Sequence, residues 1–571
     1  MSYLFVESCA MSITTRPDNR PFEVPLYRPS LHCGGVTTPP SVLPEAINQL
    51  SEEDILRFNK LMQSSQTENR YFVRIMLVGK ESVGKTCLLR RLLKENISDV
   101  TSTDGVDIVV RRCKINLEDG KWKIEEEYVD FWFDSIHCHR TADDPKSEHF
   151  DPPIILVFTG KDKCDKEYIP KRIEKLDDQL DKVLGYHSKH HHLHDKFYLS
   201  NTEDHDNAFQ GLRTAIFDTA RKMNNWGQAL PMKWILLEYL IEINKDQGRN
   251  FVKLTDMIEM GKHPDINIIE KEDLLVFLRF QHNIGNIIFF ENIPDLIILK
   301  PQWLADAFRC LVSNRIEAKF HHLSDYKLLK NHDKISKSLI SKLFESKKGS
   351  QFLGQQGNLH QLMEKLDIIV KVDTDLYIMP SNMPASAFED VCKNVGIRNT
   401  DCKRTSWLCL KFDFLPPSFF NHLSAWFIRN YNPSKLDSDN GSFALYRGIC
   451  MFDIDSSGCV KILVTMSTDI IALQVVSFSK QRDVGKTCND IYNKVKDVVE
   501  KIRKSYKVKI SFKLHFKCSD GDYYKDTIVY ETLSSQHEYY CPQHKTAHQS
   551  DLIYSPWLKN EYGFLTVFNR I

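Results

Sequence analysis

Apolar and polar residues follow two patterns along the chain, and the change between them divides the chain into regions. In the first region, short apolar runs such as Tyr71–Val78 and Ile154–Phe158 alternate with amphipathic stretches of helical spacing, at 87–93, 168–186 and 207–224. Strands separated by helices predict a parallel sheet with its ligand at the carboxyl ends of the strands. The fold class expected here is α/β, with a further strand at 196–201.

From Pro231 onward helical spacing dominates, with helices expected from Trp234 and at 251–260, 270–280 and 301–312. The runs 287–290 and 296–299 are interpreted as paired strands of a small wing, and Trp303 as a core anchor. The Lys- and Ser-rich residues 325–350 are expected to form a mobile, partly helical surface segment. Beyond residue 405 the pattern predicts a mixed region with a helix at 486–503 and strands at 406–413, 443–453, 458–466, 470–478, 507–516 and 526–532.

The first 44 residues are rich in proline and polar residues, and they are predicted to be a disordered arm. The run Ser51-Glu52-Glu53-Asp54 is typical of a helix start, and it predicts an amphipathic helix within residues 45–69.

Composition narrows the class of protein without naming a function. Lys+Arg and Asp+Glu are both 76, and this balance gives no reason to expect nucleic acid or an anionic membrane as a partner. The 15 cysteines contain no C-x-x-C pair, which is typical of reduced thiols in a cytoplasmic protein. There is no membrane-spanning apolar run, and the start of the chain lacks the pattern of a signal peptide.

The strongest chemical signal reads G-K-E-S-V-G-K-T, between a buried strand and a helix, which is the context of a phosphate-binding P-loop. Glycines let the backbone curl around a phosphate, and the backbone N–H groups and the helix dipole then face its oxygens. Lys85 is expected to reach the β- and γ-phosphates and Thr86 to bind Mg²⁺, with an ordinary glycine-rich turn as the alternative. The predicted cradle comprises Gly79, Lys80, Glu81, Ser82, Val83, Gly84, Lys85 and Thr86.

Several segments together resemble the Roco family, in which a Roc GTPase domain precedes a COR domain. The Roc resemblance lies in the P-loop, T-D-G-V-D-I at 103–108, P-P-I-I-L-V-F-T from Pro152 and S-N at 200–201. The COR resemblance lies in G-N-I-I-F-F from Gly285 and I-L-K-P-Q-W-L-A-D, which ends at Asp306. The resemblance implies a Ras-like domain at 70–228, a winged-helix-like first COR half at 229–390, a mixed α+β second COR half at 391–555 and a tail at 556–571.

The resemblance also assigns roles to residues beyond the P-loop and implies GTP or GDP with Mg²⁺ as ligands. Thr103 matches the switch threonine that completes the Mg²⁺ shell, and Asp162 matches the carboxylate that selects guanine. Thr159 begins the same loop, and Ser200 and Asn201 match the loop behind the base. Gly160 departs from the family, which favours Lys or His there, and a simple turn is the alternative for this loop.

One family element is missing from the sequence. Ras-like domains hold Mg²⁺ and the γ-phosphate with D-x-x-G, but before the strand at 154–158 neither Gly105 nor Gly120 has Asp three positions earlier. Asp130 is a possible replacement for the aspartate, but Phe133 stands where the glycine is needed. A real deletion, a splice form or an imperfect gene model would each explain this gap.

Three functions therefore stay open: a GTP-dependent switch with slow hydrolysis, a pseudo-GTPase scaffold, and an ATP-binding P-loop protein. The resemblance implies a homodimer through COR and protein effectors that the sequence does not name. No H-R-D, D-F-G or kinase glycine loop is found, so a kinase activity is not expected.

Weaker signals complete the set. Gly485-Lys486-Thr487 lacks the earlier P-loop glycine and is interpreted as a helix start. Cys541, His544 and His548 have spacing typical of zinc ligands, with Cys518 or His537 as a possible fourth, against the alternative of a surface loop. A histidine cluster is expected to be a solvated loop rather than a metal site: His187, His190, His191, His192 and His194.

Overall fold

The structure is a computed structural model, and its contacts divide the chain into two units. The N-terminal unit comprises Tyr3–Phe133 and Thr141–Arg309, and the C-terminal unit comprises Cys310–Ile571 with Asp134–Arg140 and Met1–Ser2. The structure describes residues 10–14, 45–70, 72–77, 84–94, 96–98, 133–138, 152–185, 188–223, 227–311, 324–332, 334–345, 350–397, 402–436, 442–478, 485–505 and 509–558.

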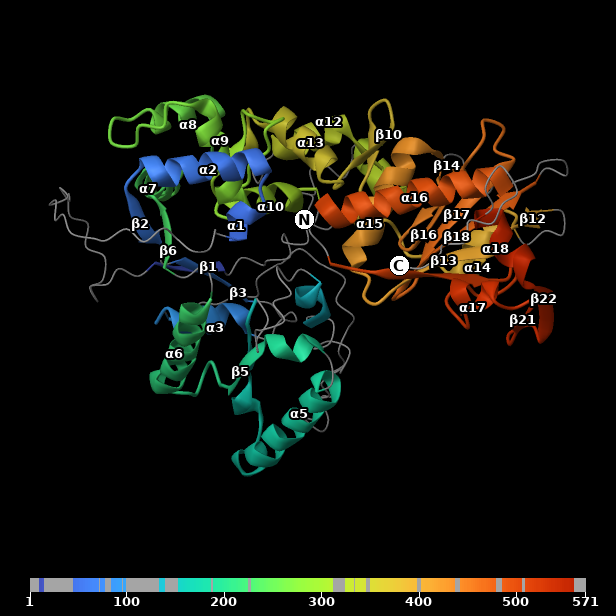
Figure 1. The fold of residues 1–571 in the computed structure, drawn as a ribbon, viewed down its shortest axis with the longest axis horizontal. Coiled ribbons are helices and arrows are strands. Elements are labelled where there is room, and N and C mark those ends of the chain that lie inside the picture. The colour runs from blue at the N-terminus through green and yellow to red at the C-terminus, as the bar shows by residue number, and fades with distance from the viewer. Residues whose placement is uncertain are drawn as a thin grey trace. The chain divides into compact units, whose positions relative to one another are not determined.

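The first part of the N-terminal unit is the predicted α/β region (Figure 1). Strand β4 (Ile154–Phe158) pairs in parallel with β5 (Leu193–Tyr198), and α5 (Ile169–Leu184) crosses between them. Strand β5 begins three residues before the expected 196 and ends at Tyr198. The other elements are β3 (Phe72–Met76), α3 (Lys85–Leu92) and α6 (Asp206–Lys222). Strand β1 (Ala10–Thr14) pairs antiparallel with β3, and these five residues therefore differ from the expected disordered arm.

Alternation along β4 explains how helices cover both faces of this strand pair. Ile155 and Val157 pack into a cluster with Leu88 of α3 and Phe209 of α6. Ile154 and Leu156 face a second cluster, which includes Leu180 and Leu184 of α5 together with Phe133. Residues 154–157 of β4 thus all contact apolar neighbours, which is the reason for the uninterrupted apolar sequence of this strand.

The second part of the N-terminal unit is mostly helical. Its elements are α1 (Glu45–Asn48), α2 (Glu52–Ser64), β2 (Thr67–Arg70), β6 (Gln228–Pro231), α7 (Met232–Asp246), β7 (Phe251–Val252), α8 (Leu254–Gly261), α9 (Lys271–Asn283), β8 (Ile297–Ile298) and α10 (Pro301–Arg309). Strand β2 pairs antiparallel with β6, so the helix preceding the α/β region is joined to the region that follows it. Ser51 caps α2 by accepting from the Asp54 backbone N–H at 3.2 Å, as the capping pattern predicts.

The predicted wing differs from the observed pairing. A single bridge joins Ile288 to Ile298, while β8 pairs as a strand with β7 at Phe251–Val252. Short apolar runs predict burial, but a partner strand elsewhere in the chain is not visible in local sequence.

The C-terminal unit begins with α11 (Ser324–His332), β9 (Lys334–Ser336), α12 (Lys337–Phe344), α13 (Gln356–Lys365), β10 (Val370–Asp373) and β11 (Leu376–Ile378). The expected surface segment at 325–350 is wrong in part, because β9 belongs to a three-stranded sheet and α12 buries Leu339, Ile340, Leu343 and Phe344. Those four positions have helical spacing, which the high Lys and Ser content obscured.

A nine-stranded sheet forms the centre of the C-terminal unit (Figure 1). Its order is β14 (Asn432–Pro433), β16 (Ile449–Asp453), β17 (Val460–Met466), β18 (Ile470–Ser477), β13 (Trp407–Phe412), β19 (Phe512–Lys517) and β20 (Ile528–Val529), with β12 (Lys403–Arg404) on β18 and β15 (Leu445–Tyr446) on β16. One face packs with α15 (Pro417–Asn430) and α16 (Gly485–Ser505), and the other with α14 (Phe388–Asn394). Helix α16 begins at Gly485, as expected for the second G-K-T.

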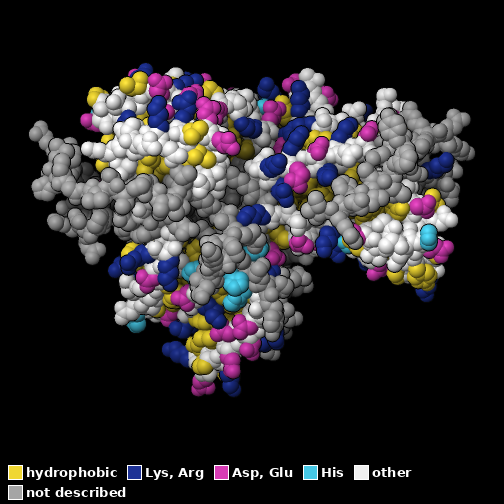
Figure 2. Space-filling model, in the orientation of Figure 1, with side chains coloured by type: hydrophobic (Ala, Val, Ile, Leu, Met, Phe, Trp, Pro, Cys, Tyr) yellow, Lys and Arg dark blue, Asp and Glu magenta, His cyan; other side chains and the backbone are white. Residues whose placement is uncertain are grey.

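The surface agrees with the balanced charge of the sequence. Figure 2 shows Lys and Arg side chains interspersed with Asp and Glu on the displayed face. Among the described residues, no helix combines the length and the apolar character needed to cross a membrane.

A substitution of Trp234 tests the hydrophobic core of the helical part of the N-terminal unit. It is 1% exposed, and its ring centroid lies 5.2–5.6 Å from those of Phe58, Phe277 and Phe280. Trp234→Ala is expected to lower the free energy of unfolding by about 3–5 kcal/mol, because the indole leaves a cavity.

Tyr239→Ala on the same helix is the matched control, because Tyr239 is 54% exposed. It is expected to change that free energy by at most about 0.5 kcal/mol. Urea unfolding followed by circular dichroism compares the two variants, and equal losses would contradict the assignment of Trp234 to the core.

Candidate functional site

The described part of the predicted P-loop is its junction with α3. Gly84 precedes α3 with φ 82° and ψ 26°, in the left-handed region that favours glycine. Lys85 is the first helical residue, so the helix begins where the sequence predicts. The other predicted cradle and metal positions, residues 79–83, the Thr86 side chain and Thr103, lie outside what the structure describes.

The two predicted base loops meet at the carboxyl ends of β4 and β5. The Leu199 N–H donates to the Phe158 carbonyl at 2.9 Å, which continues the strand pairing beyond β5. Thr159 and Gly160 then lead into the short helix η1 (Lys161–Lys163), with Gly160 at φ 80°. Parallel strands end at the same edge of a sheet, and this brings the loop of Asp162 beside that of Ser200.

Asp162 and Ser200 are in direct contact. The Ser200 hydroxyl donates to Asp162 Oδ1 at 2.7 Å, and Ser200 is 1% exposed. This hydrogen bond is the main cause that holds the pKa of Asp162 below its usual value, with burial acting in the opposite direction. Asp162 is therefore an ionised acceptor at neutral pH.

Asn201 joins the second predicted base loop to the end of the predicted P-loop. Its amide Nδ2 donates to the Gly84 carbonyl oxygen at 3.1 Å. A Cβ added to Gly84 would lie 2.7 Å from the same Nδ2 atom, so the contact requires glycine. Asn201 is 8% exposed, and its Oδ1 is buried without a hydrogen-bond partner among the residues described. A buried acceptor without a hydrogen bond lowers the stability of the fold, and a ligand with a hydrogen-bond donor would satisfy it.

Asp204 organises the loop, and it was not among the predicted site residues. Its Oδ2 accepts from the Ser200 backbone N–H at 2.8 Å, and its Oδ1 accepts from Lys161 Nζ at 3.2 Å. Arg91 of α3 donates to the Asp204 backbone carbonyl. The available sequence signal was an Asp four positions after Ser200, because Asp and Ser commonly hydrogen-bond to nearby backbone groups in turns.

The histidine cluster is only partly described, and its interpretation as a solvated loop is wrong for His192. This residue is 0% exposed, and its Nδ1 lies 2.8 Å from the Pro152 carbonyl oxygen. It ends η3 (Ser188–His192) just before β5, where it anchors the loop that precedes β4. In the part of the chain that the structure describes, the histidines here do not belong to the metal-ligating group that is found.

Comparison with known proteins agrees with the order of the two regions. Residues 231–383 match the family described as C-terminal of Roc, COR-A domain. Over these residues the chain is similar to COR-A domains, which follow Roc domains. This confirms the resemblance stated from the sequence.

Two curated proteins are similar in sequence to parts of this chain. The probable serine/threonine-protein kinase pats1 of Dictyostelium discoideum is 24% identical over 352 residues, which cover 51% of this chain and 10% of that protein. ADP-ribosylation factor-like protein 3 of Pongo abelii is 32% identical over 94 residues, 16% of this chain and 56% of that protein. The chain thus spans less than two thirds of either relative.

A solved structure, Methanosarcina barkeri Roco2 RocCORdC bound to GDP, is 17% identical with a TM-score of 0.34. The alignment covers 53% of this chain and 93% of that one.

The residues before the COR-A domain fit a nucleotide at this edge of the sheet. Gly84 leaves space that a side chain would fill, Asn201 presents a buried unpaired oxygen, and Asp162 presents an ionised carboxylate. A nucleotide supplies N–H donors from its base and negative charge for a helix start. For Mg²⁺ the donor set is incomplete in the described residues, because its predicted ligands lie outside them.

Gly84→Ala is expected to destabilise the N-terminal unit by about 1–2 kcal/mol, because the left-handed backbone is costly for alanine. It should also break the contact with Asn201. Gly211→Ala, inside α6, is the control, because an added Cβ there would lie 3.8 Å from the Phe197 ring, an ordinary contact. This substitution should be neutral or stabilising by up to about 1 kcal/mol. Thermal unfolding compares them, and a stabilising Gly84→Ala would contradict the geometry.

Ser200→Ala is expected to raise the pKa of Asp162, because it removes the main cause of its depression. The folded-state pKa lies below the unfolded value of about 3.9, so the carboxylate stabilises the fold above that pH. In the wild type this stabilising contribution is lost as the pH falls through the folded-state pKa of Asp162. In Ser200→Ala that pKa is higher, so the smaller contribution that remains is lost at a higher pH. NMR titration of labelled Asp carboxyl groups measures the shift, and Thr214→Ala on α6 should leave it unchanged.

Proposed function

We propose that this chain is a guanine-nucleotide-binding Roc-COR protein. The observation that carries the proposal is the convergence of Asp162, Ser200 and Asn201 with Gly84 at the carboxyl edge of β4 and β5. These residues come from three separate segments, and they match the predicted base and phosphate loops. The COR-A domain that follows supports the assignment of the preceding region as Roc.

The chemistry of Asp162 favours guanine over adenine. Guanine presents N1–H and a 2-amino group along one edge, and a carboxylate accepts from both. Adenine has an unprotonated N1 and no 2-amino group, so an ionised carboxylate would face a lone pair. Hydrogen bonds to a charged acceptor contribute about 1.5–3 kcal/mol, which is enough to discriminate between the bases.

In this proposal residues 79–86 hold the phosphates, Lys85 neutralises their charge, and the hydroxyls of Thr86 and Thr103 bind Mg²⁺. The metal would shield the negative charge of the phosphates. Ser200 keeps Asp162 ionised and oriented, and Asn201 ties the base loop to the helix that begins beneath the phosphates. Domain bounds of 70–228 for Roc, 229–390 and 391–555 for the COR halves, homodimerisation through COR and a cytoplasmic location belong to the same proposal.

The absence of D-x-x-G before β4 favours a scaffold that binds nucleotide over a switch that hydrolyses it. Without that glycine N–H, the chain lacks the usual means of sensing the γ-phosphate. We propose tight binding with slow or no turnover, in which bound nucleotide stabilises the Roc region for association through COR.

Nucleotide analysis tests the proposal directly. The purified full chain is denatured, and released nucleotide is identified by chromatography, while phosphate release is followed with GTP and Mg²⁺. GTP or GDP in near-stoichiometric amount, with no phosphate released over hours, supports a guanine-binding scaffold. Recovery of ATP, or no nucleotide and no affinity for any, would overturn the proposal.

Asp162→Asn is expected to weaken guanine nucleotide binding by at least tenfold and to improve binding of xanthine nucleotides. Xanthine carries a 2-carbonyl oxygen, to which the new amide can donate. Asp178→Asn, at an exposed position of α5, should change neither affinity. Fluorescent-nucleotide titration measures both, and unchanged guanine affinity in Asp162→Asn would contradict the role of this carboxylate.

A further inference from the structure

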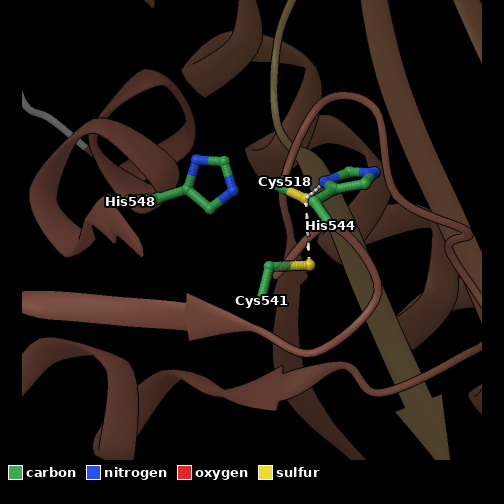
Figure 3. Close-up of side chains that lie close together, drawn as sticks. All are labelled: Cys518, Cys541, His544 and His548. Atoms are coloured by element: carbon green, nitrogen blue, oxygen red, sulfur yellow. Dashed lines mark hydrogen bonds between the residues drawn. The ribbon is translucent and has the colours of Figure 1, made fainter. Parts of the chain in front are cut away.

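Four cysteine and histidine side chains meet at one end of the sheet in the C-terminal unit (Figure 3). Cys518 directly follows β19, and Cys541 ends β21 (Glu538–Cys541). The chain then turns through His544 into β22 (Thr546–Gln549), which carries His548. Two chain segments, the end of β19 and the β21–β22 hairpin, therefore each supply ligand atoms.

The distances match tetrahedral metal binding. Cys518 Sγ lies 3.6 Å from Cys541 Sγ and 3.3 Å from His544 Nδ1, and all four ligand atoms lie within 4.8 Å of one another. Zn–S and Zn–N bonds of about 2.3 and 2.1 Å in a tetrahedron place two sulfurs about 3.8 Å apart and sulfur and nitrogen about 3.6 Å apart. The two measured pairs would move apart by a few tenths of an ångström around the ion, while any separation near the 4.8 Å limit would shorten.

Both imidazoles are prepared to act as ligands. His544 Nε2 lies 3.2 Å from the Asp520 carbonyl oxygen, which can only accept, so Nε2 carries the hydrogen and the Nδ1 lone pair faces Cys518. His548 Nε2 is buried and has no hydrogen-bond partner in the described structure. Figure 3 shows the His548 ring directed toward the two sulfur atoms. Such an unpaired nitrogen costs about 1–3 kcal/mol unless a ligand satisfies it.

The loops that carry the ligands are joined by further contacts. The Asp522 N–H donates to Gln543 Oε1 at 2.9 Å, which links the segment after Cys518 to the turn after Cys541. Gly521 packs so closely that an added Cβ would lie 3.1 Å from Cys518 Sγ. The cysteines are 4% and 0% exposed, so their sulfur atoms are shielded from solvent. This is a built site rather than a surface loop with incidental histidines.

We propose that the C-terminal unit holds one structural zinc ion on four side chains: Cys518, Cys541, His544 and His548. Two thiolates and two imidazoles satisfy tetrahedral Zn²⁺ and leave no open position, which is typical of structural sites. The sequence left Cys518 and His537 as alternative fourth ligands, and the structure brings in Cys518, while His537 is exposed and outside the group.

The ion has a clear structural role. Strands β21 and β22 pair only with each other among the described strands, and an isolated hairpin is marginally stable. Zinc would tie this hairpin to the end of β19 in the main sheet. It would also support α18 (Ser550–Leu558), which begins directly after β22 and buries Trp557.

Metal analysis of the full chain tests the proposal. The protein is purified under reducing conditions, without chelators or a histidine tag, and its metals are measured by mass spectrometry. One zinc per chain is expected, falling below a tenth in Cys541→Ser. His537→Asn and Cys459→Ser are matched controls, and they should keep one zinc per chain.

Rescue separates a metal role from a folding role. His548→Ala should weaken zinc binding at least tenfold in competition with a chromophoric chelator, whereas His548→Cys should restore it through a third thiolate. Cobalt(II) added to apo protein should give the visible bands of a tetrahedral thiolate site, with stronger sulfur charge-transfer absorption in His548→Cys. Removing zinc should lower the Tm of wild type and leave Cys541→Ser unchanged.

Three outcomes would overturn the proposal. They are a full chain that binds less than a tenth of an equivalent of added zinc, a Cys541→Ser variant that keeps full zinc content, and a Cys518–Cys541 disulfide recovered from protein prepared under reducing conditions.

Discussion

The candidate nucleotide site depends on the parallel pairing of β4 with β5. Because the two strands run in the same direction, their carboxyl ends lie side by side, and the loops that leave them must meet. The pairing is held by apolar side chains on both faces, with α3 and α6 on one and α5 on the other. Asp162 and Ser200 are 38 positions apart in sequence, and the strand pairing brings them within hydrogen-bond distance.

Polar contacts connect the loop after β4 with the loop after β5. Asp204 holds the backbone of Ser200 and the ammonium of Lys161, while Ser200 in turn holds Asp162. Asn201 extends the connection to the start of α3 through the Gly84 carbonyl. One amide side chain therefore links the loop after β5 to the residue that precedes α3.

The C-terminal unit combines two sources of stability. Its large sheet is covered by helices on both faces, and apolar side chains pack between them. The β21–β22 hairpin lies beyond that sheet and has a small apolar contribution of its own, with Tyr539 and Cys541 buried on alternate positions. A metal ion at its base would replace missing apolar burial by ligand bonds. Cys518, one residue past β19, belongs to the proposed zinc site and connects this site to the main sheet.

The sequence alone determined the elements whose signals are local. Strand β4, the capped start of α2, the need for glycine at Gly84 and the burial of Trp303 follow from spacing, turn chemistry and burial along short stretches. Only the tertiary structure decided which distant segments meet: β7 with β8, Asp204 with Ser200, and Cys518 rather than His537 with the Cys-His turn. Short-range patterns report which side of an element is buried, whereas partner choice depends on chain folding over many residues, which no local pattern records.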